Sequence, residues 1–321
     1  MNALPLLGVA LATLSSPNAI AQIAPRASQL VDLDTDGIGL LPSVATDGDL
    51  TAIAFCDSNG GRNAIEVVTS DGRGTAWSAP IRVDGGVAGD TRLTQYDACK
   101  VFGQNVYVVW EDDRSPTSGR FDLYFNRSTD GGASFGSELR LDKGYPVDTG
   151  SIREWRFVAA NANDLYVFFS VIDSAPSGQV QAFLLSSHDA GSNWSGPVRV
   201  DQMGTDPADD VERIAIAVDP SDSDVVHMAW IDTRSGSSDV FYRRSSDGGA
   251  TLAGGEVQLD SSGVGVGDAK LAVEIAVDLT GQNLAVAWLE DGLTDADEQL
   301  QLSFSLDGGA TFAADTTVAG G

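Results

Sequence analysis

The stretch DLDTDG, residues 32–37, places carboxylates at alternate positions, as in the first half of a calcium-binding loop. Such side chains can converge on one hard cation, so Asp32, Asp34 and Asp36 are candidate calcium ligands. The twelfth position of the loop is Ser43 here, where a bidentate Glu is expected, so a plain acidic turn remains the alternative. With two His and two Cys in the chain, zinc and haem sites are not expected, and calcium is the one cofactor considered.

Two further stretches repeat one pattern of aromatic, carboxylate and arginine residues. They run from Trp110 to Arg114, followed by Asp122 and Tyr124, and from Trp230 to Arg234, followed by Asp239 and Tyr242. Paired Asp and Arg groups could form a polar catalytic ledge. Because the pattern recurs in two parts of the chain, we favour a structural interpretation in which each Arg bridges neighbouring strands.

The sequence that surrounds these residues contains one unit repeated five times. An acidic octet recurs as TSDGRGTAW (69–77, one residue longer), STDGGASF (128–135), SHDAGSNW (187–194), SSDGGATL (245–252) and SLDGGATF (305–312). The spacings between the aspartates Asp71, Asp130, Asp189, Asp247 and Asp307 are 59, 59, 58 and 60 residues. Spacing this regular indicates internal repeats of one structural unit.

Each octet is flanked by alternating apolar segments. A short strand ending in Asp follows it, as in IRVD (81–84), and an apolar strand closing on an aromatic residue precedes it, as in VYVVW (106–110). Each unit therefore holds four short strands with no room for a long helix. The sequence predicts an all-β fold, a β-propeller of four-stranded antiparallel blades near residues 37–84, 90–142, 150–201, 210–260 and 268–318.

The number of blades depends on one extra segment, QLVD (29–32), which looks like an outermost strand without a blade of its own. Either it pairs with the last blade and closes a five-bladed ring, or the chain has lost most of a sixth blade at its C-terminus. We favour five blades.

The octet pattern S-x-D-x-G-x-x-[W/F] resembles the Asp-box, or BNR repeat, of the sialidase superfamily, and its five copies cover most of the chain. The resemblance implies that each box joins the third and fourth strands of a blade, on the perimeter and away from an active site. The residue types agree with this role, because Asp can accept turn N–H groups and Gly supplies a positive φ. We therefore interpret the octet aspartates as structural.

The resemblance also implies catalytic residues that can be looked for. Sialidases of this family use three arginines that clamp a carboxylate, an Asp acid/base, and a Tyr nucleophile assisted by a Glu. The first arginine stands in an Arg-Ile-Pro motif, and here Leu40 occupies its place before Pro42. The third arginine and the Tyr usually come late, yet no Arg follows Arg244 and no Tyr follows Tyr242. We expect no standard sialidase catalysis and name no catalytic residue.

The starts of the innermost strands should line the central mouth, where propellers usually bind ligands. Matching the blades through their aromatic strand ends puts Leu40, Gln95, Glu154, Arg213 and Val273 at like positions. The predicted ligand-binding residues there are Arg92, Tyr96, Asp97, Glu154, Trp155, Arg156 and Arg213. This mixture suits a sugar or an acidic glycan, through stacking and charge-assisted hydrogen bonds. A water-filled or salt-bridged funnel is the alternative.

Composition limits the partners. A net charge of −27 repels nucleic acid and anionic lipid, so we expect neither as a partner. Residues 4–21 are apolar or small and end in Ala19-Ile20-Ala21, which fits the cleavage rule of a secretory signal. The short stretch before them has no Lys or Arg, so a buried strand or an untidy tail is the alternative. No other segment approaches the ~20 apolar residues of a spanning helix.

These features predict a signal peptide at 1–21 and a single propeller domain at 22–321, in a secreted, periplasmic or cell-surface protein. In an oxidising compartment Cys56 and Cys99 could pair, but two buried thiols fit the sequence equally well. The first hypothesis for function is a monomeric module that binds a glycan or an extracellular protein without standard sialidase catalysis. The alternatives are a sialidase-like glycoside hydrolase with an altered site and a structural cell-surface module, and fold alone does not decide among them.

Overall fold

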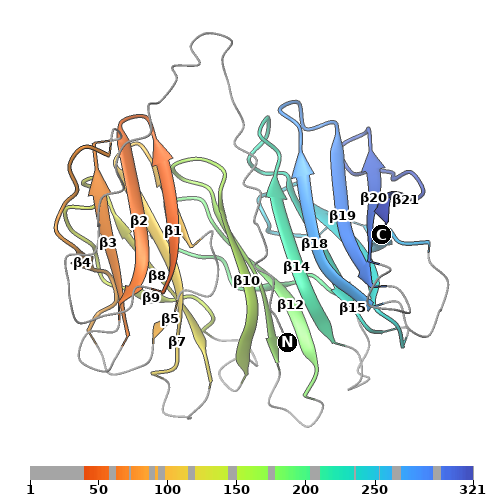
Figure 1. Ribbon diagram of the computed structural model, residues 1–321, viewed down its shortest axis with the longest axis horizontal. Coiled ribbons are helices and arrows are strands. Elements are labelled where there is room, and N and C mark those ends of the chain that lie inside the picture. The colour runs from red at the N-terminus through yellow and green to blue at the C-terminus, as the bar shows by residue number, and fades with distance from the viewer. Residues whose placement is uncertain are drawn as a thin grey trace. The chain divides into compact units, whose positions relative to one another are not determined.

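The computed structural model describes residues 40–57, 63–71, 74–86, 91–92, 98–114, 120–143, 150–172, 178–202, 210–234, 236–252, 254–261, 269–291 and 298–320. Every regular element in these ranges is a β-strand (Figure 1). Within them, no helix is long and apolar enough to cross a membrane.

The strands form five sheets. The first contains β1 (Leu40–Asp47), β2 (Leu50–Asp57), β3 (Ala64–Ser70) and β4 (Ile81–Arg82). The second contains β5 (Thr91–Arg92), β6 (Cys99–Phe102), β7 (Asn105–Asp112), β8 (Asp122–Ser128) and β9 (Leu139–Arg140). The third contains β10 (Ser151–Ala159), β11 (Leu165–Ile172), β12 (Val180–Ser187) and β13 (Val198–Arg199). The fourth contains β14 (Val211–Val218), β15 (Val226–Asp232), β16 (Asp239–Ser245) and β17 (Val257–Gln258), and the fifth β18 (Ala269–Val277), β19 (Leu284–Asp291), β20 (Gln299–Ser305) and β21 (Thr316–Gly320).

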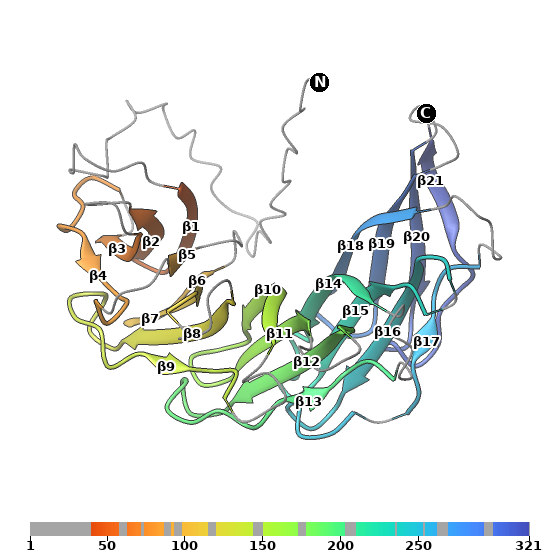
Figure 2. The ribbon, with the colours of Figure 1, turned by 90° about the horizontal axis from the view of Figure 1, so that it is seen from below.

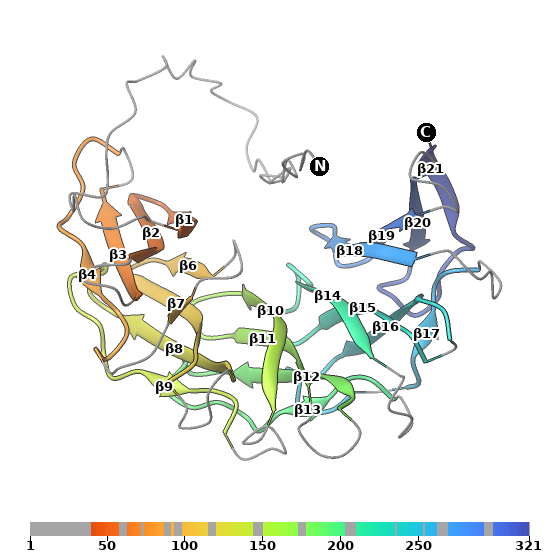
Figure 3. The same cartoon turned by 60° about the horizontal axis from the view of Figure 1, so that its bottom comes forward.

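In each sheet the strands follow chain order and pair antiparallel, as Figure 2 shows for β10 to β13. In the second sheet the first strand is divided, because β5 and β6 both pair with β7. The first strands of successive sheets also lie side by side, β10 against β14 and β14 against β18 (Figure 3). The predicted all-β propeller with five blades is confirmed.

The core lies on the second and third strands of the blades. The second strands do not close on their aromatic residues as the sequence suggested, but run two or three residues further, to Asp112, Asp232 and Asp291. The aromatic residues Trp110, Trp230 and Trp288 of these strands are fully buried. Strands covered on both faces read as continuous apolar runs, which is why VYVVW and LYVFF do not alternate with polar residues. These segments fix the register of each blade.

The octets form the turns that follow the third strands, as at Asp130. The Ser128 hydroxyl donates to Asp130 Oδ1 at 2.6 Å and accepts the N–H of Gly132 at 2.8 Å, while Asp130 Oδ1 accepts the N–H of Ser134 at 2.9 Å. The octets at Asp189, Asp247 and Asp307 repeat these contacts. Each octet Asp is thus a turn acceptor.

The first octet departs from this geometry. Its Asp71 directly follows Ser70, whereas one residue separates Ser128 from Asp130. Asp71 Oδ1 consequently lies 3.4 Å from the Ser70 hydroxyl and 3.5 Å from that of Thr75. The turn of the first blade is therefore held less tightly by these contacts than the other four.

The second octet glycine lies against the preceding blade. A Cβ atom at Gly132 would lie 2.5 Å from Thr69 Cγ2, and one at Gly191 would lie 2.3 Å from Phe125 Cζ. A Cβ at Gly309 would lie 1.9 Å from the Tyr242 hydroxyl oxygen. Only glycine permits this approach at a positive φ, so the octet sets the spacing between neighbouring blades as well as its own turn.

The aspartates that follow the short fourth strands of the first, third and fourth blades are also structural. Asp84, Asp201 and Asp260 are buried, and they accept the backbone N–H groups of Ile65 at 3.0 Å, Ala182 at 2.7 Å and Val240 at 2.9 Å on the third strands. They replace ladder bonds that such short fourth strands cannot make.

Of the two cysteine alternatives, the structure has the unbridged one. Cys56 and Cys99 are both buried, and no disulfide joins them. Burial raises the pKa of Cys99 to about 12, so its thiol is protonated and unreactive at neutral pH.

Candidate functional site

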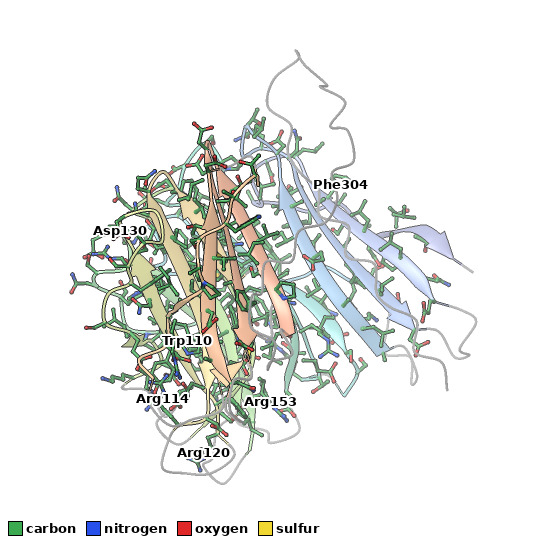
Figure 4. The ribbon with its side chains drawn as sticks, turned by 60° about the vertical axis from the view of Figure 1, so that its left-hand side comes forward. Trp110, Arg114, Arg120, Asp130, Arg153 and Phe304 are labelled. Atoms are coloured by element: carbon green, nitrogen blue, oxygen red, sulfur yellow. The ribbon has the colours of Figure 1, made fainter. Side chains whose placement is uncertain are left out.

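A cavity of about 570 Å³ opens where β10, β14 and β18 begin. We call it the β14 pocket. Its charged and polar lining residues are Arg153, Glu154, Asp210, Glu212, Arg213, Ser238 and Lys270. The starts of first strands and the octets lie at opposite ends of the blades, because the third strand runs parallel to the first and the octet follows its end. Figure 4 shows this separation for Arg153 and Asp130.

A bulge at the same point of each first strand shapes the pocket. The register skips one residue between Ile152 and Glu154, between Val211 and Arg213, and between Lys270 and Ala272. The extra residues are Arg153, Glu212 and Leu271, and all three are exposed. A bulge re-aims side chains and ends regular pairing, so neighbouring blades can present consecutive residues to one cavity.

Glu154, on β10, contributes a largely enclosed carboxyl group to the β14 pocket. Its Oε1 lies 2.6 Å from Arg156 Nη2, and its Oε2 is buried without a hydrogen-bond partner in the described residues. Burial raises the pKa of Glu154, and the charges of Arg156 and Arg213 act in the opposite direction. The group is thus a buried acceptor beside two guanidinium groups.

Two arginines face the pocket without a carboxylate in contact. Arg213 is exposed and donates from Nε to the carbonyl of Leu271 at 3.1 Å and from Nη1 to the carbonyl of Glu212 at 2.7 Å. Arg153 makes no hydrogen bond or ion pair with another residue in the described part of the chain. Both guanidinium groups therefore keep donors for a ligand.

The remaining polar groups of the pocket are acceptors and a hydroxyl. Asp210 Oδ1 accepts the N–H of Val180 at 2.7 Å, and the Ser238 hydroxyl donates to Glu212 Oε2 at 3.1 Å. Lys270 forms one wall, but its ammonium group is buried and lies 2.9 Å from Glu290 Oε1. Lys270 is thus committed to the protein, while Glu212 keeps acceptor capacity toward solvent.

The structure brings together some of the predicted binding residues. Glu154 and Arg213 line the β14 pocket, and Arg156 lies behind Glu154 as its ion-pair partner. Trp155 does not face a ligand: it is fully buried, and its indole N–H donates to Glu111 Oε1 at 2.7 Å. Neighbouring residues of a strand point to opposite faces, so Glu154 and Trp155 could not both line the mouth.

The other predicted residues are placed only in part. Arg92 belongs to β5, while Tyr96 and Asp97 lie outside the described residues. The candidate calcium ligands Asp32, Asp34 and Asp36 also lie outside them. Among the residues that the structure describes, no cluster of three or more His, Cys, Asp or Glu side chains could hold a metal ion.

The pairing of first and second strands shows which residues hold like positions in different blades. Leu40 pairs with Cys56, one residue after Phe55, just as Arg213 pairs with Ile231, one residue after Trp230. Leu40 thus holds the backbone position of Glu154 and Arg213, as the sequence indicated. Val273 was wrongly matched, because it pairs with the aromatic Trp288 itself and Ala272 holds the like position.

The repeated arginine patterns are cross-links within their blades. Arg114 forms ion pairs with Asp112 and Glu138, and its guanidinium carbon lies 4.3 Å from the centre of the Tyr124 ring. Arg234 contacts Asp232 and Glu256 in the same way and lies 4.0 Å from the centre of the Phe241 ring. These contacts engage the arginines on three sides, as a structural role requires.

Sequence reasoning missed Arg153, Asp210, Glu212, Ser238 and Lys270 as pocket residues. Arg153 and Glu212 each stand one residue before the positions matched between blades, Glu154 and Arg213. They could have been predicted only if the bulge at that point had been known. The sequence carries no signal for such a bulge beyond the polar residues that interrupt an apolar strand start.

No protein-family model and no curated protein matches this chain. Among solved structures, it is similar to a protein of unknown function from Dyadobacter fermentans, with 13% sequence identity and a TM-score of 0.50 over 88% of this chain and 94% of that one. An α-L-arabinanase from Penicillium chrysogenum complexed with arabinobiose has 16% identity and a TM-score of 0.49 over 88% and 82%. The Hadza microbial sialidase Hz136 has 14% identity and a TM-score of 0.48 over 88% of this chain and 58% of its own.

At 13% identity, the similarity to the Dyadobacter fermentans protein concerns the fold alone. Fold and site together define a β-propeller with a polar pocket where the first strands of its third, fourth and fifth blades begin.

Proposed function

We propose that this chain is an exported Asp-box propeller that binds a glycan in the β14 pocket and lacks standard sialidase catalysis. The observation that carries the proposal is the presence of two arginines, Arg153 and Arg213, on a cavity of about 570 Å³ with no carboxylate in salt-bridge contact among the described residues. In a chain with 46 acidic and 19 basic side chains, such guanidinium donors would otherwise be readily neutralised.

The neighbouring groups suit a polyhydroxylated ligand. Glu212 and Asp210 offer carboxylate acceptors to sugar hydroxyls, and Ser238 offers a hydroxyl. The two guanidinium groups suit a ring oxygen, a hydroxyl or an acidic substituent. A cavity with a few convergent polar groups of both kinds is typical of a small-ligand site.

Binding should be measured on a glycan array that includes neutral and carboxylated oligosaccharides, followed by calorimetry with the best hit. Arg153→Ala and Arg213→Ala should each weaken binding about tenfold or more, since each removes charge-assisted hydrogen bonds. Arg127→Ala is the matched control, because Arg127 carries the same charge at the octet end and bonds the carbonyl of Ala190. Equal weakening by the control, or no glycan binding at all, would overturn the proposal.

The absence of standard catalysis has its own test, because Leu40 stands where a carboxylate-binding arginine is expected. A fluorogenic sialoside should not be turned over by the chain. Turnover at ordinary sialidase rates, abolished in Arg213→Ala, would contradict this part of the proposal without affecting glycan binding.

Calcium binding at Asp32, Asp34 and Asp36 stays a separate prediction. A bound cation stabilises the folded state by mass action, so chelation should lower the melting temperature. An unchanged melting temperature removes the calcium prediction.

A further inference from the structure

Two stretches of the chain have the sequence that accepts N-linked oligosaccharides, Asn-x-Ser/Thr with x other than Pro. They are NRS (126–128) and NWS (193–195). The first overlaps the start of the second octet and the second overlaps the end of the third octet. A folded chain can carry an oligosaccharide only where the asparagine amide has room and a hydrogen to give up, and the structure separates the two stretches on this point.

Asn126 is enclosed and fully engaged. The residue is 3% exposed, and its Nδ2 atom donates to the carbonyl oxygens of Val83 at 2.9 Å and Gly136 at 3.0 Å. An amide nitrogen has two hydrogens, so both are used. The Ser128 hydroxyl is buried as well and donates to Asp130 Oδ1 at 2.6 Å. An oligosaccharide on Asn126 would break one of these hydrogen bonds and has no space in the folded blade.

Asn193 differs on each of these points. It is exposed, and its Nδ2 atom donates to Asp189 Oδ2 at 2.6 Å, the one hydrogen bond of this atom among the described residues. One amide hydrogen therefore stays available. Ser195, the third residue of the stretch, is exposed too. The middle residue, Trp194, packs edge-on against Phe125 with ring centroids 5.2 Å apart, so it anchors the stretch to the preceding blade.

The octet turn keeps its contacts when Asn193 is substituted on Nδ2. An N-linked sugar replaces one amide hydrogen, and the hydrogen that remains can still donate to Asp189. One donor at this place is sufficient, because the residues at the same octet position elsewhere each donate a single hydroxyl hydrogen to their octet aspartate. These residues are Ser134, Thr251 and Thr311.

We propose that Asn193 is the acceptor of an N-linked oligosaccharide at the octet of the third blade. The inference rests on the export that forms part of the proposed function, because this modification belongs to secreted proteins. The donor class is an oligosaccharide carried on a polyisoprenyl diphosphate. Asn193 Nδ2 bonds to C1 of the first sugar, the C1–O bond to the diphosphate breaks, the diphosphate leaves with the electron pair, and a carboxylate of the transferase takes the amide proton.

The position of Asn193 leaves the β14 pocket open. The octets lie at the end of the blades opposite to the starts of the first strands, as Figure 4 shows for Asp130 and Arg153. Modified and unmodified chains should therefore bind a glycan in the pocket with equal affinity.

Production of the full chain in eukaryotic cells tests the proposal. One arm keeps the N-terminus as it is, and the other places a signal peptide of the host in front of it. The chain recovered from the medium or from the secretory compartments should be heavier than its sequence mass by one core oligosaccharide. Peptide-N-glycosidase should remove the oligosaccharide and convert the asparagine to aspartate, and tandem mass spectrometry should place this change at position 193.

Matched variants separate the acceptor from its surroundings. Asn193→Thr keeps a donor to Asp189, as Thr251 does in the fourth blade, so it should abolish the modification without lowering the melting temperature of the unmodified chain. Ser195→Ala should also abolish the modification, while Ser195→Thr keeps the acceptor sequence and should retain it.

An unmodified chain in the secretory compartments or the medium would overturn the proposal. An oligosaccharide on Asn126 of the folded chain would overturn it as well, because the structural distinction between the two stretches would then fail. A chain that enters the secretory pathway only behind the host signal would contradict export alone, since the second arm still decides whether Asn193 is modified.

Discussion

The Nδ1 atom of His227 lies 2.7 Å from the hydroxyl oxygen of Tyr242, and both side chains are buried between the fourth and fifth blades. The two residues stand on the paired strands β15 and β16, and their rings stack with centroids 6.0 Å apart. The Nε2 atom of His227 has no hydrogen-bond partner among the described residues. A proton added to this ring would therefore be a buried charge with one polar contact.

Acid should destabilise the fold through this histidine. Burial is the main cause that lowers the pKa of His227 from 6.5 to about 4; the charge of Asp219 opposes this change and the charge of Arg244 adds to it. The unfolded chain therefore binds a proton near pH 6.5 that the folded chain binds only near pH 4. The stabilisation is complete above pH 6.5 and is lost as the pH falls toward 4, by about 3 kcal/mol in total.

Urea unfolding of the wild type and of His227→Gln at several pH values between 4 and 7 measures this loss. The variant removes the titrating ring and keeps a polar group near Tyr242, so its free energy of unfolding should depend less steeply on pH. Carboxylates affect both proteins alike. Parallel pH profiles would show that His227 does not contribute.

Spacing between blades should be sensitive to the octet glycine. Gly309→Ala places a Cβ atom 1.9 Å from the Tyr242 hydroxyl oxygen at a φ of 80°. Backbone strain and overpacking together should lower the free energy of unfolding by about 3 kcal/mol.

Gly254 provides the control for that prediction, because its φ is 78° and a Cβ atom there would meet no atom within 4 Å. Gly254→Ala should therefore cost only the backbone strain, about 1 kcal/mol. Adding Tyr242→Phe should restore part of the stability of Gly309→Ala. Equal losses at the two glycines would exclude close packing as the cause.

The octet aspartate should stabilise its turn only while ionised. Hydrogen bonds from Ser128 and Ser134 lower the pKa of Asp130 to about 2. Asp130→Ala should reduce the melting temperature by a few degrees at neutral pH, because the turn N–H and hydroxyl groups lose their acceptor. Since the folded pKa lies below the unfolded one, the difference between variant and wild type should disappear as the pH falls from 4 toward 2. Asp49→Ala, at an exposed turn position, should leave the melting temperature unchanged.

Much of the fold follows from the repeat in the sequence. The octets mark the end of each third strand, and aromatic residues such as Trp230, two residues before the end of β15, mark the second strands. Between the aromatic residue and the octet, the alternation of inward and outward side chains leaves few ways to pair the second and third strands. The outlying octet at Asp71 also shows its one-residue shift in the sequence, as a missing residue between Ser70 and Asp71.

The pocket was only partly predictable, for three physical reasons. A bulge changes which face a residue occupies, and it brought Arg153 and Glu212 into the β14 pocket. The hairpin between β18 and β19 (278–283) is one residue longer than the hairpin between β10 and β11 (160–164), and this moved the matched position from Val273 to Ala272. Burial also depends on the neighbouring blade, which sequence alone does not place. Trp155 looked like a stacking platform but fills the space beside Glu111 instead.

A buried cluster of charged residues at the wall of the β14 pocket should affect both glycan binding and the stability of the fold. The Lys270 ammonium group lies 2.9 Å from Glu290 Oε1 and 3.7 Å from Asp260 Oδ2, and all three residues are largely buried. Burial raises the pKa of Asp260, while Lys270 acts to lower it. Lys270 thus neutralises two carboxylates, one of which also accepts the N–H of Val240.

Removal of that cation should be costly. Lys270→Met leaves two buried carboxylates without their common partner and should lower the free energy of unfolding by about 3 kcal/mol, as for one half of a buried ion pair. Lys270→Met combined with Glu290→Gln should recover part of this loss, because only Asp260 then lacks a counter-charge, and its raised pKa allows it to bind a proton. Urea unfolding measures both variants, and glycan binding is measured beside it. A single variant as stable as the wild type would show that the cluster contributes little. A double variant that regains stability but not binding would show that Lys270 also orients the pocket wall.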